Sequence, residues 1–333
     1  MPLGDTTFEF ATETLPEPQS PAVRSQIGAV RRLSRDAGPA VVAIGGGNGL
    51  ASALRAARLY ASSVTAVVSV ADDGGSSGRL VSELEILPPG DMRKCLVALA
   101  ADGSPWAEAL DYRFDSGELK GHSLGNLILA GLADVRGGFP EALTTVETLL
   151  ECEGRVFPAT TDRVSLVAKT SRGRIVGQVA IANAGTPIHE VRLEPSAPRA
   201  HPAALEAIAE CDQIILGPGS LYTSVLPPLV VPEIRDAVMS ARAHRVYVCN
   251  LVAQPGETDG LDAGSHAKAL IDHGISFETM IYDDGGNPGG VAPEGIDESL
   301  YAVVGAQLAG ESNPARHSPE VLAALLADEI LRR

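Results

Sequence analysis

The sequence predicts an α/β protein of the Rossmann-like, doubly wound type, with a mainly parallel sheet and a small antiparallel insert. Three observations lead to this prediction. Short runs that are apolar throughout alternate with segments of helical periodicity, which is typical of strands buried on both faces of a parallel sheet. Several of these runs end in polar loops rich in glycine, as strands of open α/β sheets do at their carboxyl ends. Between residues 155 and 200 the pattern changes to short strand-like runs separated by turns, which indicates the insert.

The first half of the chain contains an extension followed by a strand–helix–strand unit. Residues 1–38 show little apolar periodicity and are rich in Thr, Glu, Pro and Ala, so we predict a mobile extension before a single domain formed by residues 39–333. Asp91 is interpreted as the cap of a helix that restarts after a Pro-Pro-Gly break. The predicted elements of this half are strands at 41–44 and 64–70 and helices at 50–60, 80–101 (broken at 88–90), 119–133 and 140–151.

The second half contains the insert and then resumes the alternation of strands and helices. The insert, placed at about 155–200, holds three short runs that alternate with turns. Its predicted strands are 164–169, 175–182 and 188–193. Beyond it we predict strands at 213–216, 245–249 and 277–282 and helices at 202–211, 231–243, 264–273 and 318–331.

Composition excludes several classes of protein. Of the 333 residues, 45% are hydrophobic but only 4% are aromatic, so the core must consist of Ala, Val, Leu and Ile. The formal net charge of −16 repels nucleic acid and anionic membrane surfaces, and neither is an expected partner. No apolar run approaches the roughly 18 residues of a membrane span. The chain shows no basic start followed by an apolar stretch, so a secretory signal is not predicted. We therefore expect a cytoplasmic protein.

A glycine-rich turn follows the first predicted strand. Gly45, Gly46, Gly47, Asn48 and Gly49 place almost no side chain between a phosphate and the backbone, and the next helix would offer free N–H groups. The spacing is neither the dinucleotide fingerprint nor a P-loop. A tight turn without a ligand is the alternative, but the glycine triplet favours a phosphate cradle.

An acidic loop follows the second predicted strand. Asp72 and Asp73 stand there, with Ser76, Ser77 and Arg79 directly behind them. Carboxylates at this position bond a ribose hydroxyl or hold Mg²⁺ against phosphates. The alternative is a turn that caps the next helix.

Further polar groups follow other predicted strands or open helices. His122 and Asn126 lie one helical turn apart and could share a ligand. Gly217, Gly219 and Ser220 form a second glycine loop that is typical of an anion nest. Asn250 and Gln254 suit recognition of a base or sugar. Asp91 and Lys94, by contrast, are interpreted as a helix cap and a solvated side chain. Because loops after parallel strands meet at one sheet edge, we expect the loops to line a single cleft.

Together these residues resemble the CofD-like superfamily, and within it the YvcK/GlmR branch known as gluconeogenesis factors. The resemblance covers about 40–282, and its long acidic run is highly specific. The matching segments are GGGNGL (45–50), ADDGGSSGRL (71–80), PPGD (88–91), GHSLGN (121–126), GPGSLYTS (217–224) and CNLVAQPGET (249–258).

The resemblance implies a cytosolic bacterial protein that binds UDP-sugars, notably UDP-N-acetylglucosamine. It further implies that the protein supports cell-wall precursor supply and cell shape on gluconeogenic carbon sources. By position, the two glycine loops would contact phosphates, and Asp72 and Asp73 would lie near a metal ion or the ribose. Asn250 and Gln254 would lie near the nucleoside, while Arg316 and Tyr301 would contact the sugar nucleotide.

This chain departs from the pattern of the family in three places. Asn48 replaces the usual Thr of the glycine turn. Lys94 stands where many members have Asn. The region after Asp284 is shorter, although the C-terminal pair Arg316-His317 is present.

Two functions remain open from the sequence. The first is a regulator without catalytic residues or a required cofactor, which binds a UDP-sugar, self-associates and acts on an enzyme of amino-sugar synthesis. The second is a Mg²⁺-dependent transferase that moves a phospholactyl-type group from a guanosine diphospho donor to a deazaflavin. The long Ser-rich run after Asp73 favours the first.

Overall fold

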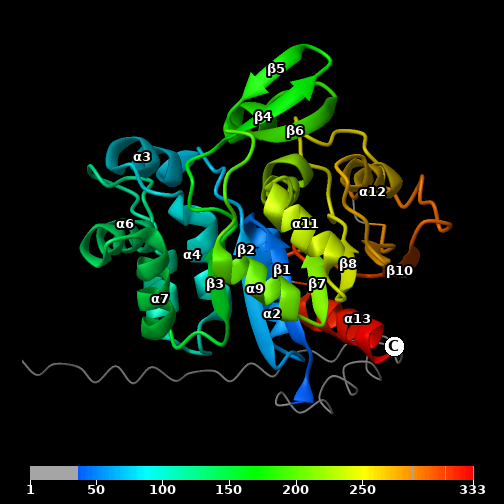
Figure 1. Ribbon diagram of the computed structural model, residues 1–333, viewed down its shortest axis with the longest axis horizontal. Coiled ribbons are helices and arrows are strands. Elements are labelled where there is room, and N and C mark those ends of the chain that lie inside the picture. The colour runs from blue at the N-terminus through cyan, green and yellow to red at the C-terminus, as the bar shows by residue number, and fades with distance from the viewer. Residues whose placement is uncertain (1–36, 287–288, 312, 333) are drawn as a thin grey trace, which may run out of the picture.

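A computed structural model describes residues 37–286, 289–311 and 313–332. Its central feature is a seven-stranded sheet in the order β10-β9-β8-β7-β1-β2-β3, in which neighbouring strands pair in parallel. The predicted Rossmann-like fold is therefore confirmed (Figure 1). Nearly all of the predicted N-terminal extension lies outside the described residues. The strands are β1 (Ala40–Gly45), β2 (Ser63–Val68), β3 (Arg155–Pro158), β7 (Gln213–Leu216), β8 (His244–Val248), β9 (Thr279–Asp283) and β10 (Ala302–Ala306).

Helices cover both faces of this sheet. Along β1, Val41 and Ala43 enter one core while Val42 and Ile44 enter the other, because successive side chains of a strand point to opposite faces. The first core includes α2 (Gly47–Ala57), α4 (Pro89–Leu99), α6 (Leu124–Arg136), α7 (Phe139–Leu149) and α13 (Pro319–Leu331). The second includes α9 (Pro202–Glu210), η2 (Leu221–Val225, a π-helical turn), α10 (Leu226–Leu229), α11 (Pro232–Ser240) and α12 (Ala263–Asp272). Two further helices are α3 (Gly75–Leu84) and α5 (Pro105–Asp111).

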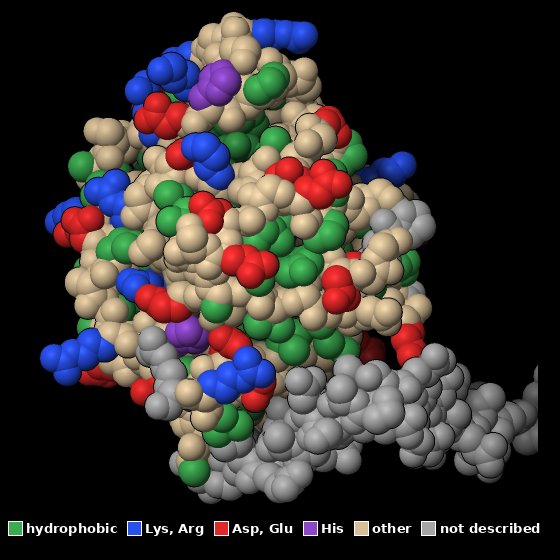
Figure 2. Space-filling view, turned by 90° about the vertical axis from the view of Figure 1, so that its right-hand side faces the viewer, with side chains coloured by type: hydrophobic (Ala, Val, Ile, Leu, Met, Phe, Trp, Pro, Cys, Tyr) green, Lys and Arg blue, Asp and Glu red, His purple; other side chains and the backbone are tan. Residues whose placement is uncertain are grey.

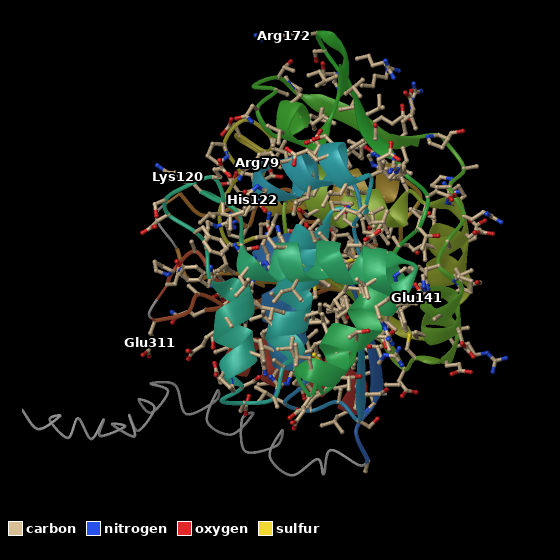
Figure 3. All side chains as sticks on the ribbon, turned by 90° about the vertical axis from the view of Figure 1, so that its left-hand side faces the viewer. Arg79, Lys120, His122, Glu141, Arg172 and Glu311 are labelled. Atoms are coloured by element: carbon tan, nitrogen blue, oxygen red, sulfur yellow. The ribbon has the colours of Figure 1, made fainter. Side chains whose placement is uncertain are left out.

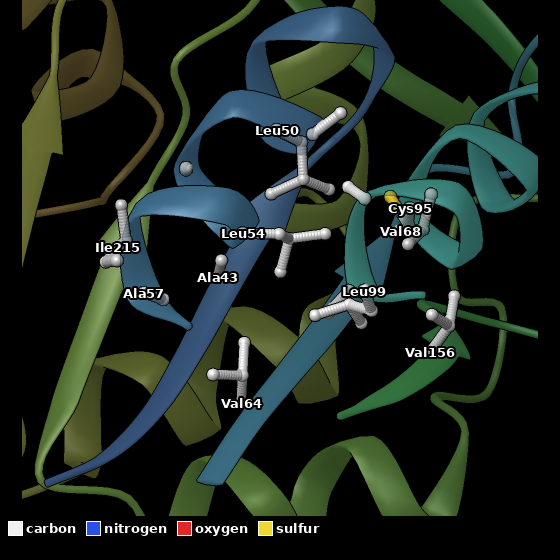
Figure 4. Packing of buried hydrophobic residues seen from close by; sticks show 14 of the residues in the cluster. Ala43, Leu50, Leu54, Ala57, Val64, Val68, Cys95, Leu99, Val156 and Ile215 are labelled. Carbon is white, nitrogen blue, oxygen red and sulfur yellow. The ribbon is translucent and has the colours of Figure 1, made fainter. Parts of the chain in front are cut away.

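The core is built from small aliphatic side chains, as the low aromatic content predicts. Figure 4 shows Leu50 and Leu54 of α2 packed over Ala43 of β1, with Leu99 of α4 beside them. All four side chains are fully buried. Small side chains let α2 lie close on β1, which holds the turn between these two elements in place.

A separate antiparallel sheet in the order β5-β4-β6 confirms the predicted insert. Its strands are β4 (Ser165–Thr170), β5 (Gly173–Val176) and β6 (Ile188–Glu194). It stands at the top of Figure 1, and Figure 2 shows basic side chains gathered there. Exposed basic side chains and an exposed histidine of this sheet are Lys169, Arg172, Arg174, His189 and Arg192. The insert is thus a locally basic part of an acidic protein.

Two predictions about the insert need correction. Residues 155–158 do not belong to it, because they pair with β2 and form the edge strand β3 of the main sheet. The strand predicted at 175–182 ends at Val176. Gly177 then adopts φ 100°, and α8 (Gln178–Ala182) begins, because the Asp73 carboxylate accepts the first free N–H groups of that helix.

Two predicted helix starts were also wrong. Asp91 is not a cap, because α4 already begins at Pro89, and proline is favoured in the first turn. The helix predicted from residue 119 begins at Leu124, since the Ser123 side chain accepts the N–H of Asn126 and caps it. The edge strand β10 escaped prediction because its residues are only partly buried.

Candidate functional site

A cavity of about 430 Å³ opens at the carboxyl edge of the main sheet. From β1 the chain runs outward through β2 to β3, while β7, on the other side of β1, starts a run outward to β10. The cavity lies between the loops that follow β1 and β7, which is the topological switch point where open α/β sheets bind ligands. The residues that were predicted from the sequence and that line this cavity are Gly46, Gly47, Asn48, Gly49, Asp72, Gly219, Ser220, Asn250, Gln254 and Arg316. Four separate loops and the C-terminal region therefore converge, as expected.

The two glycine turns pack directly against each other. A Cβ atom on Gly49 would lie 2.6 Å from the carbonyl carbon of Pro218 and 2.8 Å from the amide nitrogen of Gly219. Gly47 has φ +70°, which favours glycine. Gly45 and Gly217 do not line the cavity but lie behind it, where the Gly217 N–H donates to Ile44. Glycine is required here for backbone packing as well as for access to a ligand.

Asn250 carries an unsatisfied hydrogen-bond donor into the cavity. Its side-chain Oδ1 accepts the Gly219 N–H at 2.9 Å, which joins the loop after β8 to the second glycine turn. Its Nδ2 is buried and has no partner among the described residues, although the residue lines the cavity. A buried donor without a partner costs about 1–3 kcal/mol. A ligand acceptor at this position would remove that cost.

The predicted acidic pair is split by the structure. Asp72 lines the cavity and accepts the Gly74 N–H at 3.0 Å. Asp73 does not line it, because its two oxygens accept the N–H groups of Gln178 and Val179 at 3.0 and 2.9 Å. Asp73 therefore holds α8, which places Gln178 in the cavity wall.

The carboxylate beside Asp72 in the cavity is Asp91 of α4, which the sequence did not assign to the site. Burial, followed by repulsion from Asp91, raises the pKa of Asp72 above its usual value. The side chain of Asp91 accepts from Lys94 Nζ at 2.9 Å, and both residues line the cavity. Their interpretation as a cap and a solvated side chain was therefore wrong. Their spacing of three residues on one helix face was the available signal.

These groups do not fit the Mg²⁺ site that the family resemblance implies. Asp73 is engaged with α8, and an ammonium already neutralises Asp91. Within the described ranges, no group of three or more His, Cys, Asp and Glu side chains could hold a metal ion.

A second predicted group lies outside the cavity. Ser76 Oγ is 2.9 Å from His122 Nδ1 and accepts from Asn126 Nδ2 at 3.1 Å, so these side chains join α3 to α6. Arg79 donates to the carbonyl of Lys120 at 3.0 Å, and Figure 3 shows both beside His122. None of these residues lines the cavity.

Two other predicted residues also lie elsewhere. Ser77 Oγ accepts the Gly90 N–H at 3.1 Å and joins α3 to α4. Tyr301 is buried in the second core with its ring centroid 4.8 Å from that of Phe277, so it does not reach the cavity.

Several lining residues were not predicted as site residues. Ser52 follows Asn48 by one helical turn, and Thr223 and Ser224 belong to the hydroxyl-rich loop, so their positions carried a signal. In the segment before α13, His317 adjoins the predicted Arg316, but Asn313 and Ala315 carried no signal, because only the fold returns them to the sheet edge. The residues missed are Ser52, Asp91, Lys94, Gln178, Pro218, Thr223, Ser224, Leu251, Val252, Asn313, Ala315 and His317.

We expect His317 to make the protein sensitive to acid. Its Nε2 lies 3.1 Å from the carbonyl oxygen of Cys249, and burial lowers its pKa to about 4 from 6.5. Above pH 6.5 neither the folded nor the unfolded chain carries a proton there. As the pH falls towards 4, only the unfolded chain takes one up. The histidine should therefore cost about 3 kcal/mol of unfolding free energy by pH 4.

Urea unfolding at neutral and acidic pH measures this effect in His317→Gln, whose amide still donates to Cys249. The variant should lose less stability than the parent between pH 6.5 and 4. His189→Gln, on the exposed face of the small sheet, should follow the parent. An unchanged slope in His317→Gln would exclude this histidine as the titrating group.

Fold and cavity together define an open α/β protein of the Rossmann-like type, with its cavity at the switch point of the sheet. A family model described as 2-phospho-L-lactate transferase CofD matches residues 41–297. The chain belongs to the CofD family, in the branch of the gluconeogenesis factors. No helix of the described residues could cross a membrane.

Similar proteins support this assignment. The gluconeogenesis factor of Bacillus subtilis is 47% identical over 247 residues, which are 73% of this chain and 78% of that protein. The gluconeogenesis factor of Halalkalibacterium halodurans is 46% identical over 249 residues, 73% of this chain and 77% of that one. A Nostoc relative is 48% identical over 72% of this chain, which spans only 53% of the relative. A crystal structure of a Bacillus halodurans protein superposes with a TM-score of 0.80 at 37% identity, covering 88% of this chain and 99% of that one.

Proposed function

We propose that this protein binds UDP-N-acetylglucosamine in the cytoplasm and acts as a regulator that links carbon metabolism to cell-wall precursor synthesis and cell shape. The observation that carries the proposal is the unpartnered Nδ2 of Asn250, buried in the cavity wall beside the second glycine turn. Such an amide requires an acceptor, and a nucleotide sugar offers several. The gluconeogenesis factors similar to this chain support a role in carbon metabolism.

The cavity offers matching groups for each part of such a ligand. The amino end of α2 presents free N–H groups at Gly47 and Asn48, and these favour a phosphate. Arg316 also lines the cavity and forms no ion pair with a described carboxylate. Asn250 and Gln254 suit the base or ribose. A volume of about 430 Å³ falls within the range of small-molecule sites.

A transferase is the second candidate, because the matching family model is described as one. Its reaction would need a deazaflavin acceptor, a guanosine diphospho donor and Mg²⁺. We favour the regulator, because the predicted acidic pair does not face the cavity together. The target of the regulator would be an enzyme of amino-sugar synthesis.

A thermal-shift and calorimetric titration separates the two functions. UDP-N-acetylglucosamine at a hundred times its Kd should stabilise the folded chain by about 2.7 kcal/mol through mass action. We expect this stabilisation in EDTA, and none with a deazaflavin. GDP serves as the control for a nucleoside diphosphate with the wrong base. Release of GMP from the guanosine donor with modification of the deazaflavin would establish the transferase instead.

A further inference from the structure

The cavity contains its own cation. Lys94 Nζ lies 2.9 Å from Asp91 Oδ1, and both side chains belong to the cavity wall. We propose that Lys94 acts as the resident cation of this site, so that the cavity binds a nucleoside diphosphate without a divalent metal ion. The diphosphate rests on the proposed function, whereas the exclusion of a metal ion by Lys94 does not.

The carboxylates that a metal ion would need are both close to this lysine. Asp91 Oδ2 lies against the first glycine turn, 2.6 Å from where a Cβ of Gly46 would stand. Asp72 Oδ2 lies 3.1 Å from the corresponding position on Gly90, the residue before Asp91. The two acids therefore flank the first turn of α4, and Lys94 follows one turn later on the same helix face.

The charges of the wall make the lysine necessary. Two acidic residues, Asp72 and Asp91, and two basic residues, Lys94 and Arg316, line the cavity. A diphosphate ester brings two negative charges of its own. With Lys94 the charges of the wall sum to zero, so the free N–H groups of α2 can attract the diphosphate without opposition from a net negative charge. Without it the wall would be negative, and Coulomb repulsion would oppose the ligand.

An ammonium can compensate these negative charges at the position where a metal ion would otherwise stand. Mg²⁺ in nucleotide sites is held by one or two carboxylates and by phosphate oxygens. An ammonium is a compact charge with three donors, so Lys94 can bond Asp91 and still direct donors at a phosphate. Its side chain is 30% exposed and that of Asp91 is 12% exposed, so the ammonium is open to the cavity. A Mg²⁺ ion beside it would have to displace this ammonium.

Calorimetric titration of the full chain with UDP-N-acetylglucosamine, in EDTA and in excess Mg²⁺, tests the proposal. The parent protein should show the same Kd in both buffers. Lys94→Met should weaken binding in EDTA roughly tenfold to a hundredfold, the effect of losing a charged hydrogen bond. Excess Mg²⁺ should restore much of that loss. Lys94→Arg keeps the positive charge and should lose less affinity in EDTA than Lys94→Met.

The matched control is Lys268→Met, which also removes a lysine paired with an aspartate on a helix but lies outside the cavity. It should bind like the parent in both buffers. A parent protein that binds only with Mg²⁺, or a Lys94→Met variant with unchanged affinity in EDTA, would overturn the proposal.

A second measurement needs no nucleotide. Mn²⁺ binding followed by electron paramagnetic resonance should be absent in the parent and appear in Lys94→Met, then disappear again when Asp91→Asn is added. Mn²⁺ binding by the parent would overturn the role of Lys94. If the parent bound Mn²⁺ and also bound no UDP-sugar in either buffer, the metal-excluding role and the proposed function would both be overturned. If it bound neither, only the proposed function would be overturned.

Discussion

Replacing Gly49 by alanine should destabilise the protein by about 3 kcal/mol, as overpacking in a closely packed interior does. The added Cβ would stand 2.6 Å from the carbonyl carbon of Pro218 and 2.8 Å from the Gly219 nitrogen. Both are backbone atoms, so no side-chain rotation relieves the contact. The two glycine turns would have to separate, and we expect ligand binding to be lost as well.

Helix propensity alone predicts the opposite result, since Gly49 lies in α2 and alanine stabilises helices by about 1 kcal/mol over glycine. Gly131 in α6 is the matched control, because a Cβ there would meet no atom within 4 Å. Urea unfolding should show Gly131→Ala at least as stable as the parent and Gly49→Ala clearly less stable. Equal stability of the two variants would contradict the contact between the turns.

Replacing Asn250 by aspartate should weaken UDP-N-acetylglucosamine binding by about a hundredfold while leaving the fold intact. A carboxylate still accepts the Gly219 N–H, so the loop after β8 keeps its link to the second glycine turn. It cannot donate, however, and it adds a negative charge beside the expected phosphates. The variant therefore removes the hydrogen bond that Asn250 would donate to a ligand and keeps the one that it accepts from Gly219.

Calorimetry measures the affinity, and thermal unfolding checks the fold. Asn183→Asp makes the same change in charge at an exposed position on the small insert, outside the cavity, and should bind like the parent. Asn250→Ala removes both bonds and should weaken binding and lower the unfolding temperature. Affinity within a factor of about two in Asn250→Asp would remove Asn250 from the ligand site.

Local patterns were sufficient for most of the fold and for the place of the site. Fully apolar runs such as 41–44 identify buried parallel strands, because each face of the sheet needs its own apolar side chains. Glycine loops directly after such runs must gather at one sheet edge, because parallel strands end there together. The cavity at the switch point follows from these two facts, and the structure places it there.

Residue patterns along the chain are therefore enough to predict the fold class, the two glycine turns and the sheet edge that carries the cavity. Which side chains face that cavity depends on contacts that form only in the folded chain. Asp72 and Asp73 are adjacent in the chain, yet Asp73 turns away because N–H groups 105 and 106 residues further on attract it. Lys94 and Asp91 face inward because α4 packs against the first glycine turn. The direction of a loop side chain depends on such distant contacts, which no local pattern contains.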